Sequence, residues 1–254
     1  MQIVAVQLEI AWQDKLTNHA RVRELLTGAD IQPGSLIVLP EMFDTGFSMD
    51  LAVTAQDETR VSEALLKEMA IHHASTVIGG VVGPIIDGVA SNEAVAFSPE
   101  GKSLVRYRKQ QPFSLVGEHL KYGRGDGPAK FMWNGVHVAP FICYDLRFPE
   151  LFRGPALDGA ELLLVIACWP AVRSEHWVRL LQARAIENLC LTVGVNRCGG
   201  EPNLPFDGRS CGFDQMGQPL FEAGSEEAVM KFDIDIDAVR RWREKFPALR
   251  DARL

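Results

Sequence analysis

The chain has few cysteines, and their number and spacing do not suggest pairs. Five occur among 254 residues, and none belongs to a C-x-x-C motif. The six histidines also lack the spacing of metal ligands. These patterns argue against a disulfide framework and against a zinc site, so we expect no bound metal. The cysteines are Cys143, Cys168, Cys190, Cys198 and Cys211.

Long apolar runs and dense basic patches are also missing. No apolar stretch approaches the ~20 residues that cross a bilayer, so we expect no membrane partner. The formal net charge is −7, and a surface of this sign repels phosphate backbones, so we expect no nucleic-acid partner. The opening segment, MQIVAVQLEI, lacks a basic region and a cleavage site and is typical of a first strand. We therefore expect a cytoplasmic protein.

Apolar residues make up 47% of the chain and fall in short runs. Runs bounded by turn residues predict strands, and apolar residues at helical spacing predict helices. The predicted strands cover residues 3–8, 36–39, 76–82, 93–98, 104–107, 130–133, 136–142, 162–167, 191–196, 211–214 and 229–234, the last two around a turn at Gly217. The predicted helices cover 15–27, 58–73, 149–157, 174–188 (with Ser174 as its N-cap) and 237–245, and loops are expected over 109–130 and 199–208.

Strands outnumber helices in this order of elements. That ratio favours an α/β fold, an αββα sandwich of two mixed β-sheets with helices on the outer faces. The chain shows no linker, low-complexity run or internal repeat. We therefore expect one domain over residues 1–254.

The most informative segment is 138–150, VAPFICYDLRFPE. An apolar run ends at Cys143, and polar and charged residues follow at once. This pattern is typical of a buried strand that delivers a side chain to the edge of a sheet, where open α/β sheets bind ligands. Position alone leaves two interpretations of Cys143 open, a nucleophile or a small buried apolar residue.

Two other predicted strands deliver ionisable residues in the same way. Glu41 follows the run at 36–40, and Lys109 follows the strand at 104–107. A carboxylate can take the proton of a thiol, and an ammonium can stabilise an oxyanion, so with Cys143 they would complete an acyl-transfer site. Taken singly, a residue like Glu41 is more often a loop residue or a helix cap, and one like Lys109 is more often a solvated cation. Periodicity does not show that the three converge.

Three segments carry a family resemblance: LPEMF at 39–43, YRKQ at 107–110 and CYDLRFPE at 143–150. In order and spacing they resemble the signature segments of the nitrilase (carbon–nitrogen hydrolase) superfamily. The resemblance continues through ACWP at 167–170, ARAIEN at 183–188 and REKFP at 243–247, and so covers essentially the whole chain. The chain is most similar to the ω-amidase branch. The resemblance implies an αββα fold, a homodimer, and chemistry that needs no cofactor.

The resemblance also implies a role for each matching residue. Cys143 would attack an amide carbonyl, Glu41 would act as general base and acid, and Lys109 would donate to the oxyanion. The backbone N–H of Tyr144 would be a second oxyanion donor. Glu118, in the loop after Lys109, would orient that lysine or the substrate; the other interpretation is a solvated loop acid.

The residues that select the substrate are less clearly marked. A substrate carboxylate needs a cation, and Arg147 and Arg173 are the candidates, although either could form a structural pair instead. Aromatic residues on the same segments could form the walls of a small pocket or belong to the core, and they are Phe43, Phe113, Tyr144 and Trp169. We expect Arg184 and Glu187 to pair within or across the helix at 174–188. Cys168, just after another apolar run, is a rival nucleophile, but no glutamate or lysine motif matches it, and we favour a buried thiol.

Three functional hypotheses follow. The first is hydrolysis of the ω-amide of small carboxylated amides, of the 2-oxoglutaramate and 2-oxosuccinamate type, through a cysteine thioester. The second keeps the same chemistry but acts on deaminated glutathione or on N-carbamoyl amino acids. The third is a non-catalytic scaffold, against which the joint presence of Glu41, Lys109, Glu118 and Cys143 speaks.

Overall fold

Two six-stranded sheets and one two-stranded sheet contain the strands of the described residues. The computed structural model describes residues 1–202 and 204–252. The N-terminal sheet has the order β14 (Ala228–Asp233), β1 (Gln2–Gln7), β2 (Leu36–Val38), β3 (Thr76–Val82), β4 (Asn92–Phe97) and β5 (Ser103–Arg108). The C-terminal sheet has the order β13 (Pro219–Glu222), β12 (Cys211–Phe213), β9 (Leu191–Asn196), β8 (Leu162–Ala167), β7 (Val136–Ile142) and β6 (Phe131–Trp133).

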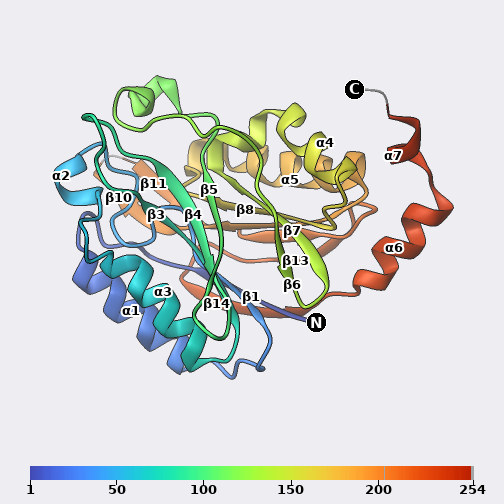
Figure 1. Cartoon of the computed structure of the whole chain (residues 1–254), viewed down its shortest axis with the longest axis horizontal. Helices are drawn as coiled ribbons and strands as arrows, with labels where there is room; N and C mark the ends of the chain where they lie inside the picture. Colours follow the sequence, from blue (N-terminus) through green and yellow to red (C-terminus); the bar gives the residue numbers. More distant parts are fainter. Residues whose placement is uncertain (203, 253–254) are drawn as a thin grey trace.

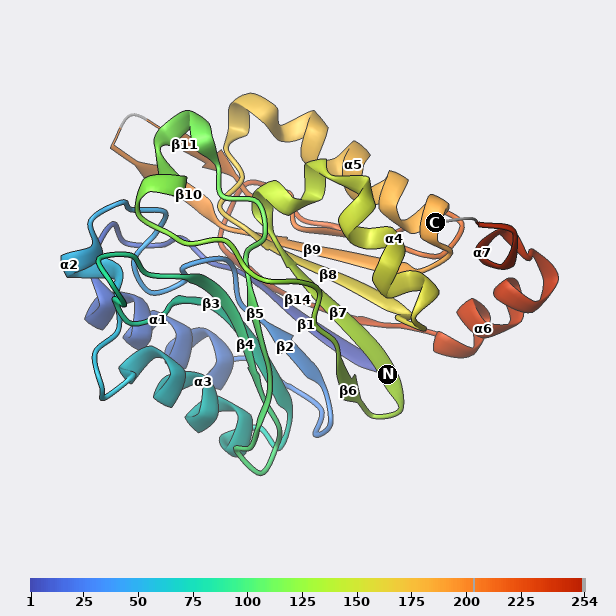
Figure 2. The same cartoon turned by 45° about the horizontal axis from the view of Figure 1, so that its top comes forward.

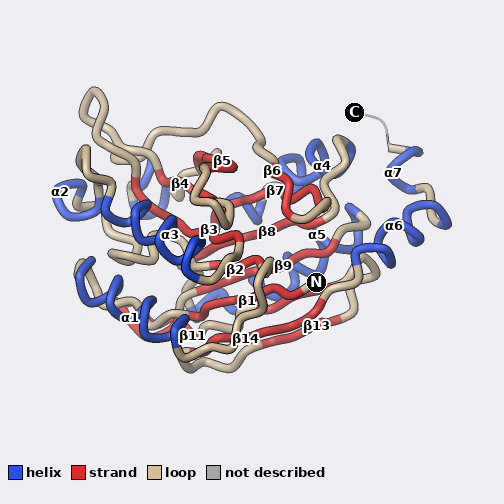
Figure 3. Tube along the Cα trace, turned by 60° about the horizontal axis from the view of Figure 1, so that its bottom comes forward, coloured by secondary structure: helices blue, strands red, loops and turns tan. Residues whose placement is uncertain are grey.

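Helices cover the outer faces of both sheets. In Figures 1 and 2, α1 (Lys15–Thr27) and α3 (Val61–His72) lie beside the N-terminal sheet, whereas α4 (Pro149–Leu157) and α5 (Ser174–Asn188) lie over the C-terminal sheet. Figure 3 shows the strands gathered inside and the helices outside. Each sheet contains both parallel and antiparallel pairs. The predicted αββα sandwich of two mixed sheets is therefore confirmed.

The remaining helices are short or lie at the edge of the molecule. The helix α2 (Leu51–Thr54) follows the loop after β2, and α6 (Ile236–Lys245) and α7 (Ala248–Asp251) project from the body near the C-terminal end (Figure 1). None of the helices in the described part of the chain is both long and apolar enough to cross a membrane.

The central strands are buried on both faces because each lies between a helix layer and the other sheet. In β1, Ile3 and Ala5 belong to the same apolar cluster as Phe141 of β7. Val4 and Val6 belong to a second cluster, with side chains of α1 and α3. Successive side chains of a strand point to opposite faces, so burial of both faces produces the continuous apolar runs seen in the sequence.

Several predicted boundaries hold, but one helix has a different N-cap and another begins later than predicted. The helix at 174–188 is found as predicted, yet Ser174 is its first residue and not its N-cap, because a short 3₁₀ helix at Ala171–Arg173 runs into it. The helix predicted from residue 58 begins at Val61, since Arg60 has a left-handed φ of 45°. The predicted loop at 109–130 contains two 3₁₀ turns, Ser114–Val116 and Glu118–Leu120.

The C-terminal third shows two larger corrections. The turn at Gly217 joins β12 to β13, whereas β14 pairs with β1 in the other sheet, so the predicted pairing of 211–214 with 229–234 is wrong. The predicted loop at 199–208 contains two strands, β10 (Cys198–Glu201) and β11 (Leu204–Asp207), which pair with each other. Residue 203, within that predicted loop, lies outside the described residues.

Candidate functional site

The backbone at Glu41 lies directly against a neighbouring strand. Glu41 follows β2 and is fully buried. A side chain at Gly80 of β3 would place its Cβ only 2.5 Å from the Cα of Glu41, so glycine is required for this approach. The next residue, Met42, has a positive φ of 44°, which only a tightly held backbone sustains. The local fold therefore fixes the carboxylate in place.

Glu41, Lys109 and Glu118 form a buried ion cluster. The ammonium of Lys109 donates to Oε1 of Glu41 at 2.9 Å and to both carboxylate oxygens of Glu118 at 3.0 Å. All three side chains are at most 1% exposed. The structure thus brings together three residues that the sequence places on different segments.

Asn92, the first residue of β4, joins the two carboxylates. Its Nδ2 donates to Oε1 of Glu41 at 2.7 Å and to Oε1 of Glu118 at 3.0 Å. The sequence analysis missed Asn92. The available signal was the polar pair Asn92 and Glu93 at the start of a strand, SNEAVAF, that then becomes apolar. Polar side chains in a buried strand need hydrogen-bond partners.

The cluster keeps Lys109 charged. Burial alone lowers the pKa of Lys109, but the negative charges of Glu118 and Glu41 outweigh burial and raise the pKa well above its usual value. The site therefore holds a permanent ammonium between two carboxylates at neutral pH.

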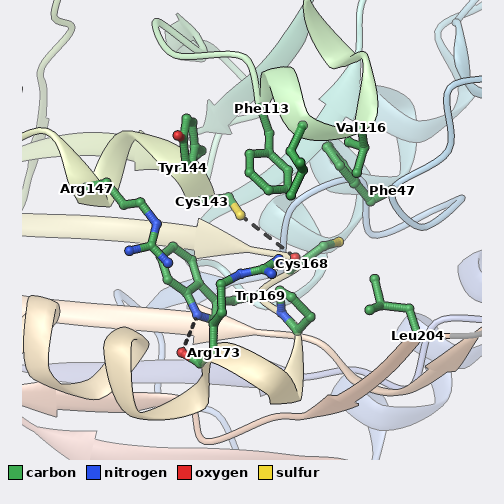
Figure 4. A pocket seen from close by; sticks show the side chains of 12 residues that line it. Phe47, Phe113, Val116, Cys143, Tyr144, Arg147, Cys168, Trp169, Arg173 and Leu204 are labelled. Atoms are coloured by element: carbon green, nitrogen blue, oxygen red, sulfur yellow. Dashed lines mark hydrogen bonds between the residues drawn. The ribbon is translucent and has the colours of Figure 1, made fainter.

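Cys143 enters the site from the other sheet, at the end of β7. It opens a short 3₁₀ helix (Cys143–Arg147) and has a left-handed φ of 46°. Asp145 secures this turn because its Oδ2 accepts from the backbone N–H of Ile142 at 3.0 Å and from the hydroxyl of Tyr107 at 2.7 Å. The turn directs the Cys143 sulfur toward the backbone oxygen of Cys168, 3.8 Å away (Figure 4).

The thiol of Cys143 rests in its protonated form. Burial raises the pKa of this thiol, the charge of Glu41 raises it further, and Lys109 only partly opposes them. A thiol of this kind needs a base to become a nucleophile, and Glu41 is the carboxylate that most strongly affects its pKa. A thiol, a carboxylate and an ammonium in this arrangement suit nucleophilic acyl transfer.

A pocket of about 390 Å³ opens beside Cys143. Two candidate arginines line it. The guanidinium of Arg147 lies 4.8 Å from the ring of Trp169 and bonds Nδ1 of His176 at 3.2 Å, and that of Arg173 lies 5.4 Å from the ring of Phe113. Within the described residues neither guanidinium pairs with a carboxylate, and burial together with the charge of Arg173 lowers the pKa of Arg147. The pocket therefore presents unneutralised positive charge.

The predicted aromatic residues divide between pocket and core. Phe113, Tyr144 and Trp169 line the pocket, but Phe43 does not. Phe43 is fully buried against α1 and α3, with its ring 5.9 Å from that of His19, and Phe47 lines the pocket instead.

Cys168 and the pair Arg184 and Glu187 lie outside the ion cluster. Cys168 also lines the pocket, but its side chain is nearly buried, and its thiol donates to the backbone oxygen of Glu41 at 3.1 Å. Arg184 pairs with Glu187 within α5 at 2.8 Å, as expected. Nowhere in residues 1–202 and 204–252 do three or more His, Cys, Asp or Glu side chains form a group that could hold a metal ion.

Comparisons with known proteins find relatives that match nearly the whole chain. The carbon-nitrogen hydrolase family model matches residues 2–244. The chain is 32% identical to a 2-oxoglutaramate amidase of Bacillus subtilis, over 99% of this chain and 97% of that protein. It is 34% identical to the omega-amidase YafV of Yersinia enterocolitica, over 99% and 96%.

Solved structures show the same architecture. A CN-hydrolase superfamily protein from Xanthomonas campestris, solved with an arsenic adduct in its active site, superposes with a TM-score of 0.92 at 32% identity, covering 100% of this chain and 97% of that one. An amidase from Nesterenkonia sp. superposes with a TM-score of 0.85 at 26% identity, covering 97% and 95%.

Proposed function

The chain belongs to the carbon–nitrogen hydrolase family and is an enzyme that hydrolyses amides; from this premise we propose that its substrates are small ω-amides that carry a free carboxylate, of the 2-oxoglutaramate and 2-oxosuccinamate type. The observation that carries the proposal is the pair Arg147 and Arg173, two arginines without acidic partners among the described residues, which line the same pocket as Cys143. A carboxylate is the natural partner of such guanidinium groups. Two full-length relatives named for ω-amide hydrolysis support the same substrate class.

In the proposed reaction Cys143 attacks the amide carbon while Glu41 takes the thiol proton. Because the thiol rests protonated, base and nucleophile act in the same step. Lys109 and the backbone N–H of Tyr144 donate to the oxyanion, and each such donor is worth roughly 10²–10³ in rate. One N–H of Lys109 can serve both oxygens of Glu118, which leaves another free to turn to the substrate.

The second half of the reaction returns the enzyme to its starting state. The tetrahedral intermediate breaks its C–N bond, Glu41 gives the proton to the departing ammonia, and a thioester on Cys143 remains. Glu41 then takes a proton from water, which attacks the thioester. As the C–S bond breaks and the acid leaves, Glu41 returns this proton to the Cys143 sulfur. Asn92 and Lys109 hold Glu41 throughout, since both donate to its Oε1.

We further infer that the enzyme works in the cytoplasm as a homodimer. All five cysteines are free, which suits a reducing compartment. The homodimer is inferred from the family resemblance of the sequence, and light scattering behind a sizing column tests it directly. A monomer at micromolar concentration would remove that part of the proposal.

The experiment that tests the substrate proposal is a panel of amides followed by ammonia release. We expect turnover of 2-oxoglutaramate and 2-oxosuccinamate, and no turnover of aliphatic nitriles. Cys143→Ala abolishes the turnover. Full activity in that variant would refute the mechanism, and carbon dioxide released together with ammonia would identify an N-carbamoyl substrate instead. Higher kcat/KM on deaminated glutathione would indicate the peptide amidase.

A further inference from the structure

The pocket beside Cys143 has more room than the proposed substrate needs. Pockets of about 300–1,000 Å³ hold drug-sized ligands, and the volume of 390 Å³ beside Cys143 falls in that range. A five-carbon monoamide of a dicarboxylic acid is much smaller. The remaining wall is apolar, and we name it the apolar end of the pocket: Phe47, Leu115, Val116 and Leu204.

The apolar end and Arg147 lie on opposite sides of the Cys143 sulfur. Figure 4 shows Arg147 to the left of that sulfur and Phe47, Val116 and Leu204 to the right. A substrate that places its carboxylate at Arg147 and its carbonyl carbon at Cys143 has filled one side of the pocket. The amide nitrogen is bonded to the other side of the carbonyl carbon, so this nitrogen and any substituent on it extend toward the apolar end.

The groups that handle protons also lie on the side of the apolar end. The ammonium of Lys109 is 5.0 Å from the centre of the Phe47 ring. Oε2 of Glu41 accepts a 2.8 Å hydrogen bond from the backbone N–H of Cys168, which lines the pocket to the right of the Cys143 sulfur in Figure 4. A nitrogen that receives its proton from Glu41 therefore leaves toward the apolar end.

We propose that the apolar end is a leaving-group subsite for an unbranched alkyl substituent, so the enzyme also hydrolyses N-alkyl ω-amides to the acid and a primary alkylamine. This inference rests on the proposed function. The Cys143 sulfur bonds to the carbonyl carbon, the C–N bond breaks, and the thiol proton passes through Glu41 to the departing alkylamine. Water then supplies hydroxide to the acyl carbon and a proton to the sulfur.

The test uses the wild-type enzyme and monoamides of glutaric acid that are unsubstituted or carry N-methyl, N-ethyl, N-propyl or N-(2-hydroxyethyl) groups. Released amine and released glutarate are both measured. We expect kcat/KM to rise about fourfold for each methylene added from methyl to propyl. The N-propyl amide should exceed its N-(2-hydroxyethyl) counterpart, which has the same length, by about tenfold.

A pair of variants tests the location of the subsite. Val116→Glu places a charge at the apolar end and should lower the ratio of kcat/KM for the N-propyl amide to that for the unsubstituted amide by at least about tenfold. Val61→Glu, at an α3 position with the same 48% exposure, should leave the ratio unchanged.

The outcomes separate this inference from the proposed function. Ammonia from the unsubstituted amide with no amine from any N-alkyl amide overturns the leaving-group subsite alone. Equal rates for the propyl and hydroxyethyl amides, or an unchanged ratio in Val116→Glu, also overturn it. No product from any member of the series overturns the proposed function itself.

Discussion

The backbone N–H of Cys168 donates a 2.8 Å hydrogen bond to Oε2 of Glu41, and the Cys168 thiol donates to the backbone oxygen of Glu41 at 3.1 Å. The proposed base, which follows a strand of the N-terminal sheet, is thus held by a residue that follows a strand of the C-terminal sheet. These two hydrogen bonds give Cys168 a role beside Cys143. The backbone N–H of Cys168 positions Glu41, and its thiol is buried.

The two thiols should therefore respond differently to truncation. Cys168→Ala keeps the backbone N–H that holds Glu41, so we expect kcat/KM to stay within about tenfold of wild type. Cys143→Ala removes the proposed nucleophile and should lower kcat by at least about 10⁴-fold. Ammonia release from 2-oxoglutaramate measures both. Inactivity of Cys168→Ala in a folded protein, with activity kept by Cys143→Ala, would exchange the two roles.

Asn92 should position the two carboxylates that it joins. Asn92→Asp replaces an amide donor with a third negative charge beside Glu41 and Glu118, so Oε1 of Glu41 keeps only Lys109 as a donor. We expect kcat for 2-oxoglutaramate to fall by at least about tenfold, with a smaller change in KM. Asn188→Asp, at an equally buried position in α5, should destabilise the protein and change kcat by less than about threefold. Equal losses of kcat in the two folded variants would contradict the role of Asn92.

The arginines of the pocket should select for the substrate carboxylate. Removing a partner of a charged hydrogen-bonded pair costs about 2–5 kcal/mol, so Arg147→Gln and Arg173→Gln should each raise KM for 2-oxoglutaramate by about 30-fold or more, with a smaller change in kcat. A neutral aliphatic amide should show no such increase. Arg179→Gln, an exposed arginine of α5, is the control. Equal losses on charged and neutral amides would show that the arginines only support the fold.

Asp145 should give the protein a stability that falls as pH rises. Burial raises the pKa of Asp145 to about 6, above its usual value of 3.8, so between pH 4 and 6 the folded state binds more protons than the unfolded state. That excess stabilises the fold below pH 4 and is lost as pH rises through 6, by up to about 3 kcal/mol. Denaturant unfolding should show the stability of Asp145→Asn rising relative to wild type by that amount between pH 4 and 7. A difference that stays constant with pH would count against this account.

Local sequence signals predicted the fold well wherever elements that are consecutive in the chain are also neighbours in the structure. The central strands β7, β8 and β9 and the helices α4 and α5 alternate along the chain, and their apolar runs end where the structure ends them. The pairing of β14 with β1 joins opposite ends of the chain and leaves no local signal. The turn at Gly217 was a correct local signal, but β13 carries half-exposed residues and lacks the pattern of a buried strand.

The candidate site divides in the same way. Glu41, Lys109 and Cys143 follow apolar runs, and this position made them visible in the sequence. Asn92 begins a strand, so the same rule did not find it. Phe43 and Phe47 lie on one segment, but Phe43 packs against α1 and α3 whereas Phe47 lines the pocket. The tight turn at Met42, which the sequence does not reveal, sets the direction of this segment.

The origin of the proposed reactive groups in two separate sheets has a mechanical consequence. Glu41 and Lys109 follow strands of one sheet and Cys143 follows a strand of the other, so the distance between the proposed base and the sulfur depends on how closely the two sheets pack. Moderate heating or hydrostatic pressure that slides one layer against the other by a fraction of an ångström would slow turnover before either layer loses its strands. The rate of turnover should therefore report small displacements of one sheet relative to the other.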